Sequence, residues 1–380
     1  MDQARVKGGV LLGALVTGAL GAGTLSAPPA AKADCFSAFG IGNGNGCTSN
    51  LTTFAIGIGT GATAAAGGFM NGAIAIGDGA SASTVLSAFT WAAAIGNAAS
   101  AGSLVSFFST ALQLGAGTAS TWGALNLVVS QNTGTGASEA GAIGIANISY
   151  QLGNGTTSTL GLFNFASGIN PTGGGAQTTG AAGLLNFSLQ LGPGTTSTVG
   201  GLNIAVGFLP NDNGTQTTAA GGVGTAAVNL SGDTGNNNVT TAGILTGAAN
   251  ISGNDTTVTA GNSAVPSILL GAFNALGNGN KVTAGPGAAA LAGSIGQNGA
   301  TNEAGGPGFN INGIAVGRPA ATLGSNRTTT TSAAAATTTA DDTVSSGPKH
   351  AAKPSGSTAR HAKASDSSGS STGGGGRHRK

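Results

Sequence analysis

Charged side chains are scarce in this sequence, at 6% of residues, and the three histidines, His350, His361 and His378, all lie near its C-terminal end. The stretch from Asp34 to Gly317 therefore has no imidazole for a Ser-His-Asp triad or for a usual zinc site. Neighbouring carboxylates in this stretch are more than twenty positions apart, so it has no local pair for glycoside hydrolysis. The sequence predicts a protein that is not an enzyme and holds no cofactor.

Proline is also sparse, and the 72 glycines follow no strict Gly-X-Y period, which excludes collagen. The mean hydropathy is positive, whereas a fully disordered chain is more polar. The apolar residues are small or β-branched and recur in short runs. We therefore expect a narrow core built from many similar layers.

Only two cysteines are present, Cys35 and Cys47. In an oxidising compartment they are expected to form one disulfide that caps the start of the repeats, in a segment spanning residues 34–54. A loop of this size contributes roughly 2–3 kcal/mol in the chain-entropy model. A metal site would need further ligands, and the neighbouring sequence has none.

Residues 1–33 have the features of a secretory signal peptide. Arg5 and Lys7 precede an uncharged apolar stretch, and the small-residue motif Ala31-Lys32-Ala33 follows. We expect cleavage before Asp34, which would leave no transmembrane segment; the alternative is an uncleaved membrane anchor. The predicted location is secreted or on the cell envelope of a bacterium.

Residues 318–380 form a basic tail rich in Ser, Thr, Gly and Ala, with nine basic and three acidic residues, and are expected to be disordered. The tail could hold anionic envelope polymers or host and surface glycans by non-specific electrostatics, or be a solvated end. Nucleic acid is not expected as a partner, because no aromatic residues interleave with the basic ones. The candidate polyanion-contacting residues are Lys349, Lys353, Arg360, Lys363, Arg377, Arg379 and Lys380.

Repeats fill residues 55–317. The phrase starting at Ile58 (Ile-Gly-Thr-Gly-Ala-Thr-Ala) recurs at Ile76 and at Ile95, with spacings of 18 and 19 residues. Further on, a short apolar run with an internal asparagine is followed by a Gly/Asn turn and a threonine-rich phrase. Each unit of about 20 residues thus predicts two strands with a turn, and stacked units predict an all-β fold, a β-solenoid (parallel β-helix or β-roll) of roughly twelve layers. The competing interpretation is low-complexity sequence with chance spacing.

Asparagines recur in register with the apolar runs and are expected to form one internal amide ladder. They are Asn126, Asn147, Asn164, Asn186, Asn203, Asn229, Asn250 and Asn274.

The Ile-Gly-x-x-Ala-x-Ala units, from about residue 55 to 102, resemble the head repeats of trimeric autotransporter adhesins. The resemblance implies a left-handed β-roll and a homo-trimer. The composition as a whole resembles secreted Gly/Ala-rich proteins of mycobacteria and related actinobacteria.

Two further patterns each have two interpretations. Asp212, Asp233 and Asp255 are spaced to stack on one edge, as a weak calcium row or simply as turn residues. The phrases Thr157-Ser158-Thr159, Thr196-Ser197-Thr198 and Thr257-Val258-Thr259 would give exposed Thr-x-Thr rows that bind ice or glycans, or serve as ordinary strand residues. The expected function is a surface-displayed structural or adhesin-like rod that self-associates or binds envelope polymers; the alternative is a ligand-binding solenoid with threonine-rich faces.

Overall fold

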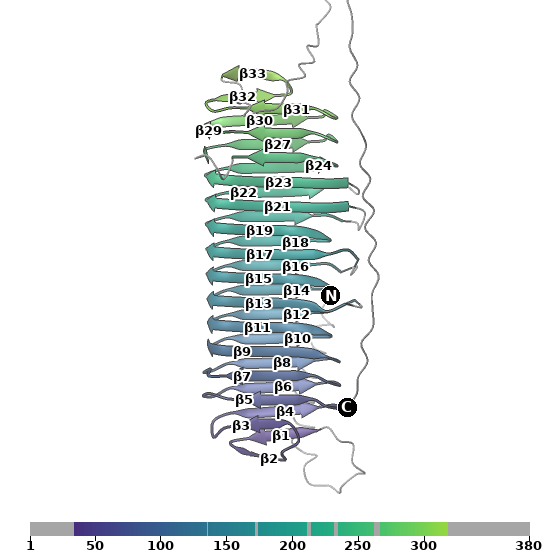
Figure 1. The fold of residues 1–380 in the computed structure, drawn as a ribbon, viewed down its shortest axis with the longest axis vertical. Coiled ribbons are helices and arrows are strands. Elements are labelled where there is room, and N and C mark those ends of the chain that lie inside the picture. Colours follow the sequence, from purple (N-terminus) through teal and green to yellow (C-terminus); the bar gives the residue numbers. More distant parts are fainter. Residues whose placement is uncertain are drawn as a thin grey trace, which may run out of the picture. The chain divides into compact units, whose positions relative to one another are not determined.

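The computed structural model describes residues 34–317 except 135, 172–173, 211–213, 232–234 and 262–266. These residues form an all-β solenoid of about 13 parallel coils without a helix, which confirms the predicted fold (Figure 1). No helix in this part of the chain is long and apolar enough to cross a membrane. The expected signal peptide, the basic tail with its seven candidate residues, Asp212 and Asp233 lie outside the described residues.

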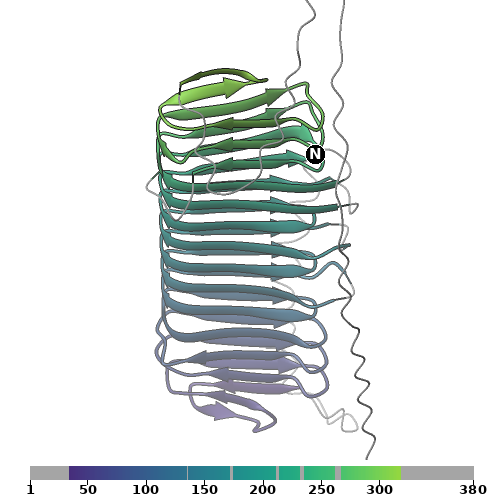
Figure 2. The same cartoon turned by 45° about the horizontal axis from the view of Figure 1, so that its top comes forward.

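Each coil contributes one strand to each of two facing sheets, and the coils stack with their strands in line (Figure 2). The first sheet comprises β1 (Cys35–Ala38), β2 (Ile41–Gly42), β4 (Phe54–Ile58), β6 (Gly72–Ile76), β8 (Trp91–Ile95), β10 (Thr110–Leu114), β12 (Leu127–Gln131), β14 (Ile148–Leu152), β16 (Phe165–Ile169), β18 (Phe187–Leu191), β20 (Ile204–Phe208), β22 (Ala226–Ser231), β24 (Gly247–Gly253), β27 (Gly271–Ala275), β30 (Ala290–Ile295), β32 (Gly308–Ile311) and β33 (Ile314–Gly317).

The second sheet comprises β3 (Cys47–Ser49), β5 (Thr63–Ala66), β7 (Ser81–Val85), β9 (Ala99–Phe107), β11 (Gly117–Ala124), β13 (Ser138–Ile145), β15 (Gly155–Leu162), β17 (Gln177–Leu184), β19 (Gly194–Gly201), β21 (Gly214–Val223), β23 (Gly235–Ile244), β25 (Thr257–Ala260), β26 (Ser267–Ile268), β28 (Lys281–Ala284), β29 (Gly287–Ala288) and β31 (Thr301–Ala304).

The sequence repeats set the register of the parallel strands. Ile58 lies opposite Ile76, which lies opposite Ile95, so equivalent residues of successive repeats pair directly. One repeat is therefore one coil, as its length predicts.

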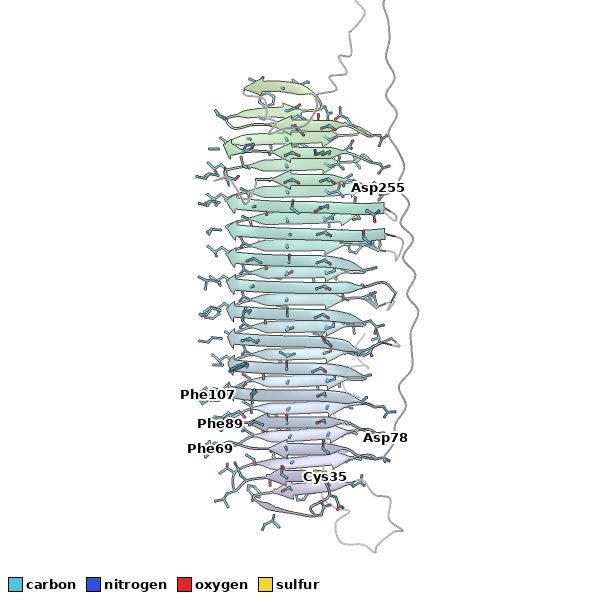
Figure 3. All side chains as sticks on the ribbon, in the orientation of Figure 1. Cys35, Phe69, Asp78, Phe89, Phe107 and Asp255 are labelled. Atoms are coloured by element: carbon cyan, nitrogen blue, oxygen red, sulfur yellow. A yellow bond between two sulfur atoms is a disulfide. The ribbon has the colours of Figure 1, made fainter. Side chains whose placement is uncertain are left out.

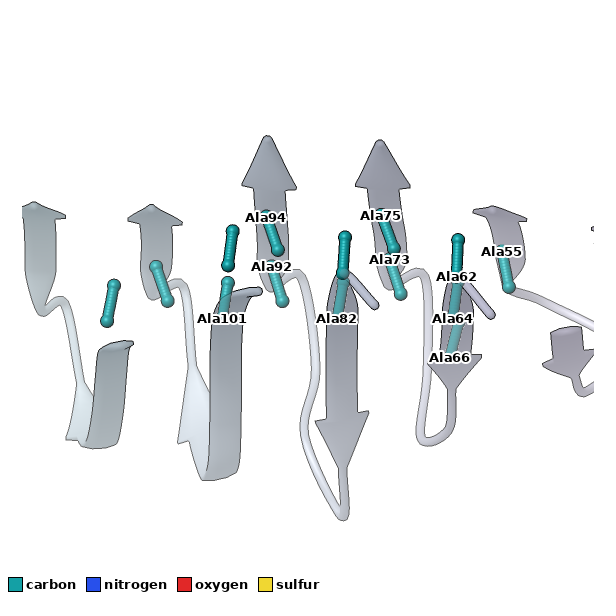
Figure 4. Packing of buried hydrophobic residues seen from close by; sticks show 14 of the residues in the cluster. Ala55, Ala62, Ala64, Ala66, Ala73, Ala75, Ala82, Ala92, Ala94 and Ala101 are labelled. Carbon is teal, nitrogen blue, oxygen red and sulfur yellow. The ribbon is translucent and has the colours of Figure 1, made fainter. Parts of the chain in front are cut away.

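The interior of the N-terminal coils consists almost entirely of alanine. Ala55, Ala73 and Ala92 form one inward row of the first sheet. The facing row of the second sheet contains Ala64, Ala82 and Ala101, and all six side chains are buried (Figure 4). Alanine side chains let the two sheets approach closely, so the core is as narrow as the composition predicts.

In the middle coils the interior becomes polar. The Gln151 Nε2 donates to Gln177 Oε1 at 2.8 Å, and Gln190 Nε2 donates to Gln216 Oε1 at 3.0 Å. Gly168 lies between Gln151 and Gln190 in the same inward row, and a Cβ there would collide with the Gln151 amide oxygen. Large amides therefore alternate with glycine along this row in the middle coils.

The eight asparagines form two rows, so the prediction of a single ladder is wrong. Five of them (Asn126, Asn147, Asn164, Asn186, Asn203) lie at the turns from the second sheet to the first. Asn229, Asn250 and Asn274 instead lie within strands of the first sheet, in the row that contains Gln190. Only these three form direct side-chain links, with Nδ2-to-Oδ1 distances of 3.0 and 2.8 Å. Similar sequence phrases do not show which of two inward rows an asparagine joins.

Two of the three threonine phrases point their threonines into the interior instead of outward. Thr157 and Thr159 are 1% and 3% exposed, and Thr196 and Thr198 are buried as well. The hydroxyl of Thr157 donates to Gln151 Oε1 in the interior. The expected exposed Thr-x-Thr rows at these two phrases are therefore wrong. The buried amides of Gln151 and Gln190 accept from the first threonine of each phrase, Thr157 and Thr196, and strand alternation turns the second one inward as well.

Antiparallel strands end the parallel stack at both ends. β1 pairs antiparallel with β2 and β4, and β32 pairs antiparallel with β33. The predicted disulfide joins the buried Cys35 and Cys47 and lies against Gly57 in the first coil (Figure 3). The cap thus extends the alanine core and blocks the first open strand edge.

Candidate functional site

The turns from the second sheet to the first create a continuous apolar surface along one edge of the solenoid, here called the apolar edge. Phe69, Phe89 and Phe107 project from it in Figure 3, on the side opposite Asp78 and Asp255. Its outward positions are occupied by large apolar residues in coil after coil. Bulky apolar side chains are therefore exposed along most of the described length of this edge.

Three adjacent positions define this turn in each coil. The first residue points outward, the second has a left-handed backbone, and the third points inward and is buried. The first residue ends the second-sheet strand from Phe107 onward, and in the two earlier turns it is Phe69 or Ala88, which form isolated bridges. In the sixth coil these residues are Leu162, Phe163 and Asn164. The left-handed position is occupied in twelve successive coils by Met70, Phe89, Phe108, Leu125, Ala146, Phe163, Leu185, Leu202, Gly224, Leu245, Leu269 and Ala289.

The inward asparagine explains why the turn has this shape. The Nδ2 of Asn164 donates to the carbonyls of Leu160 and Gly183, both at 2.9 Å. The backbone N–H of Asn186 in the next coil donates to Asn164 Oδ1 at 3.1 Å. Each asparagine thus satisfies backbone groups of its own coil and the next, which a buried turn requires. Gly161 is also required, because it has a φ of +119° and a Cβ there would collide with the Gly183 carbonyl.

The left-handed position is unfavourable for the side chains that occupy it. An L-residue in this region costs roughly 1–2 kcal/mol, and bulky residues are rare there. Glycine would avoid this cost, yet in a chain with 72 glycines only Gly224 occupies this position in the twelve described turns. Strained residues of this kind concentrate at functional sites. The backbone conformation of the turn therefore does not explain why bulky apolar side chains occupy this position.

Stacking between coils covers only part of these side chains. The rings of Phe89 and Phe108 stack with centroids 4.8 Å apart, and those of Phe165 and Phe187 with centroids 4.9 Å apart. Nevertheless Phe163 remains 54% exposed. An open hollow of about 520 Å³ interrupts the N-terminal half of the edge, with Ala88, Phe107 and Ala124 among its lining residues. A soluble monomer rarely exposes a contiguous apolar patch larger than a few hundred Å².

The opposite edge, here called the polar edge, closes the coils with exposed polar side chains. The Asp78 Oδ1 accepts a hydrogen bond from the N–H of Thr60 at 2.8 Å, and Asn97 Oδ1 accepts from the N–H of Asp78 at 3.2 Å. Asp255 accepts from the N–H of Asn236 in the same way. Asp255 is thus a turn residue that bonds to the neighbouring coil.

Charge is confined to the polar-edge half of the described residues. Their six charged side chains belong to the polar-edge turns, to the residue before the first strand, or to the first three residues of second-sheet strands: Asp34, Asp78, Glu139, Asp255, Lys281 and Glu303. Lys281 and Glu303 form a surface ion pair at 3.7 Å. Among the described residues no three Asp, Glu, His or Cys side chains gather as a metal site. The apolar edge consequently has no charged or metal-ligating group in its described part.

A row of exposed threonines does exist, one residue away from the predicted one. Thr156, Thr178 and Thr195 lie opposite one another on the outer face of the second sheet. Glu139 extends this row on the N-terminal side, and Gly141 and Gly180 interrupt the outward row beside it. In these coils the exposed threonines therefore form one narrow row, whereas the third predicted phrase, Thr257-Val258-Thr259, does point both threonines outward around the buried Val258.

No protein-family model, curated protein or solved structure matches this chain. The resemblance of residues 55–102 to adhesin head repeats stays a prediction, as does the trimer that it implies.

Proposed function

We propose that this chain is a secreted or envelope-associated structural rod of adhesin-like type and is not an enzyme. The observation that carries the proposal is the apolar edge, which presents bulky side chains at unfavourable backbone positions. Such a surface supports association with another molecule and provides no group for acid–base or nucleophilic chemistry. The rigid solenoid would hold this surface straight over about 55 Å, since twelve coils are spaced about 4.8 Å apart.

The basic tail supplies the second half of the proposal. With nine basic residues and three acidic ones after Gly317, it would contact anionic envelope polymers through non-specific attraction. The apolar edge, which has no charge, would not compete for the same polymers. The alternative, glycan or ice binding through threonine-rich faces, retains as support the narrow row around Thr178 and the outward pair Thr257 and Thr259.

Cell fractionation tests this proposal. The intact chain, a chain ending at Gly317 and a variant with Leu185→Asp and Leu245→Asp would be produced in a bacterial host. We expect the intact chain in the envelope fraction, the shortened chain in the medium and the edge variant in the envelope. Recovery of all three in the cytoplasm would contradict the proposed location, and equal release of all three into the medium would contradict anchoring by the tail.

A further inference from the structure

We propose that the apolar edge binds the same edge of a second copy of this chain, with the two solenoids antiparallel. The inference rests on the proposed structural role and names the partner of its surface. The covered area agrees with what a stable dimer needs. The edge spans the distance between two packed sheets, about 10 Å, and its length is about 55 Å. Each copy would therefore bury at least about 550 Å², and the two copies together exceed the roughly 1,000 Å² that a specific interface needs.

The two ends of the edge differ in size in a way that favours an antiparallel pair. Its N-terminal coils carry aromatic side chains, including Phe89, Trp91, Phe107 and Trp122. At the same outward positions the described coils after Gly207 have one aromatic residue, Phe309 in the last coil, and glycine or alanine occupies many of these positions. In an antiparallel pair about the centre of the edge, each aromatic coil meets a coil with small side chains.

Specific coils illustrate this complementarity. With the two-fold axis between the coils of Leu162 and Leu184, the coil of Trp122 faces the coil of Gly221. The coil of Phe107 faces the coil of Leu245. The latter leucine is exposed and lies beside the partner's hollow, which Phe107 helps to line.

The glycines at these positions are not required by the packing of one chain. Gly221 and Gly247 have no left-handed φ. A Cβ on Gly221 or Gly247 would meet only ordinary contacts, at 3.6 and 4.0 Å. Each glycine therefore leaves space on the outer surface that the coil itself does not need. Aromatic side chains of a second copy fit this space.

The equal spacing of the coils also favours a second copy of this chain as the partner. Ridges about 4.8 Å apart on one copy fit between ridges of the same spacing on the other, as in interdigitated sheets. The absence of charge among the described residues of the edge means that two copies meet without like-charge repulsion. An antiparallel pair of identical surfaces also closes after two copies and does not grow further.

Analytical ultracentrifugation of the full chain tests the dimer. We expect a mass of two chains at micromolar concentration. Leu185→Asp with Leu245→Asp should raise the dissociation constant at least 100-fold. Both positions have left-handed backbones that aspartate tolerates better than leucine, so the variant should stay folded. The matched control, Thr133→Asp with Asn298→Asp, adds the same charge to exposed positions of the polar edge and should leave the dimer intact.

Cross-linking tests the orientation. Cys35 and Cys47 are already joined, so introduced cysteines supply the reactive thiols of the described region. A mixture of Phe107→Cys and Ile244→Cys chains should cross-link to each other, and neither variant should link to itself. Self-linking of each variant would overturn the antiparallel arrangement.

A single-chain mass up to about 100 µM would overturn the proposal. If that monomer floats with neutral phospholipid vesicles and the edge variant does not, a lipid surface is the partner instead. These outcomes leave the proposed structural role intact, because cell fractionation tests that role separately.

Discussion

At the apolar edge the side chain that closes the turn points inward and an apolar side chain points out, whereas at the polar edge exposed Asp or Asn residues close the turn. Asn164 bonds to backbone groups from the interior, and Asp78 accepts a backbone N–H from the outside. Both arrangements satisfy the turn, so hydrogen bonding does not dictate what is exposed. The comparison shows that closing a coil does not require apolar side chains on the outside. Their presence is a separate property of the apolar edge.

The largest effect expected within one chain is from removing an inward asparagine. Asn164→Ala should lower the free energy of unfolding by about 3 kcal/mol, because the bonds to Leu160 O, Gly183 O and Asn186 N are lost in a buried place. Urea denaturation followed by circular dichroism measures the change. A loss below about 1 kcal/mol would show that the turn does not depend on its asparagine.

A smaller effect of opposite sign is expected at the left-handed position, which directly precedes the inward position of the turn. Leu185→Asn should raise the free energy of unfolding by about 0.5 kcal/mol, measured in urea at a concentration where the chain is monomeric. Relief of the left-handed backbone, about 1–2 kcal/mol, outweighs the loss of half-buried apolar contact. Leu160→Asn, at an outward position with an ordinary backbone, is the control and should not stabilise the chain. If Leu185→Asn destabilises the monomer by 1 kcal/mol or more, stacking within one chain explains the leucine and no partner is needed.

The smallest effect is expected at the polar edge. Asn97→Ala removes one hydrogen bond, from the N–H of Asp78, at an exposed position. We expect a loss of less than about 0.5 kcal/mol in the same urea experiment. A loss as large as that of Asn164→Ala would mean that the two edges do not differ in how they hold the coils together.

The sequence predicts the solenoid and its disulfide cap because both follow from spacing. The echo of Ile58 at Ile76 fixes one repeat as one coil, and two cysteines allow one pairing. Side-chain direction is harder to predict, because neighbouring strand residues point to opposite faces and a shift of one residue reverses them. In Thr156-Thr157-Ser158 every residue suits either face, and the buried Gln151 amide decides which one turns inward.

The apolar edge was missed for a related reason. Leu162 and Phe163 are apolar, and apolar runs are ordinarily assigned to the core. Here Phe163 has a left-handed backbone, so Leu162 and Phe163 are both exposed and Asn164 points into the core. The signal was present in the recurring order of glycine, two mostly apolar residues and asparagine, since an asparagine with a fixed place in five successive turns, from Asn126 to Asn203, indicates the inward position.

Tryptophan fluorescence of the full chain over a dilution series tests the central claim most directly. The chain has two tryptophans, Trp91 and Trp122, and both lie on the apolar edge, 44% and 51% exposed in the single chain. We predict that emission shifts to shorter wavelength between about 0.1 and 100 µM as the mass doubles. The variant with Leu185→Asp and Leu245→Asp should keep the long-wavelength emission throughout. Emission that is independent of concentration, at the mass of one chain, would contradict the pairing of apolar edges.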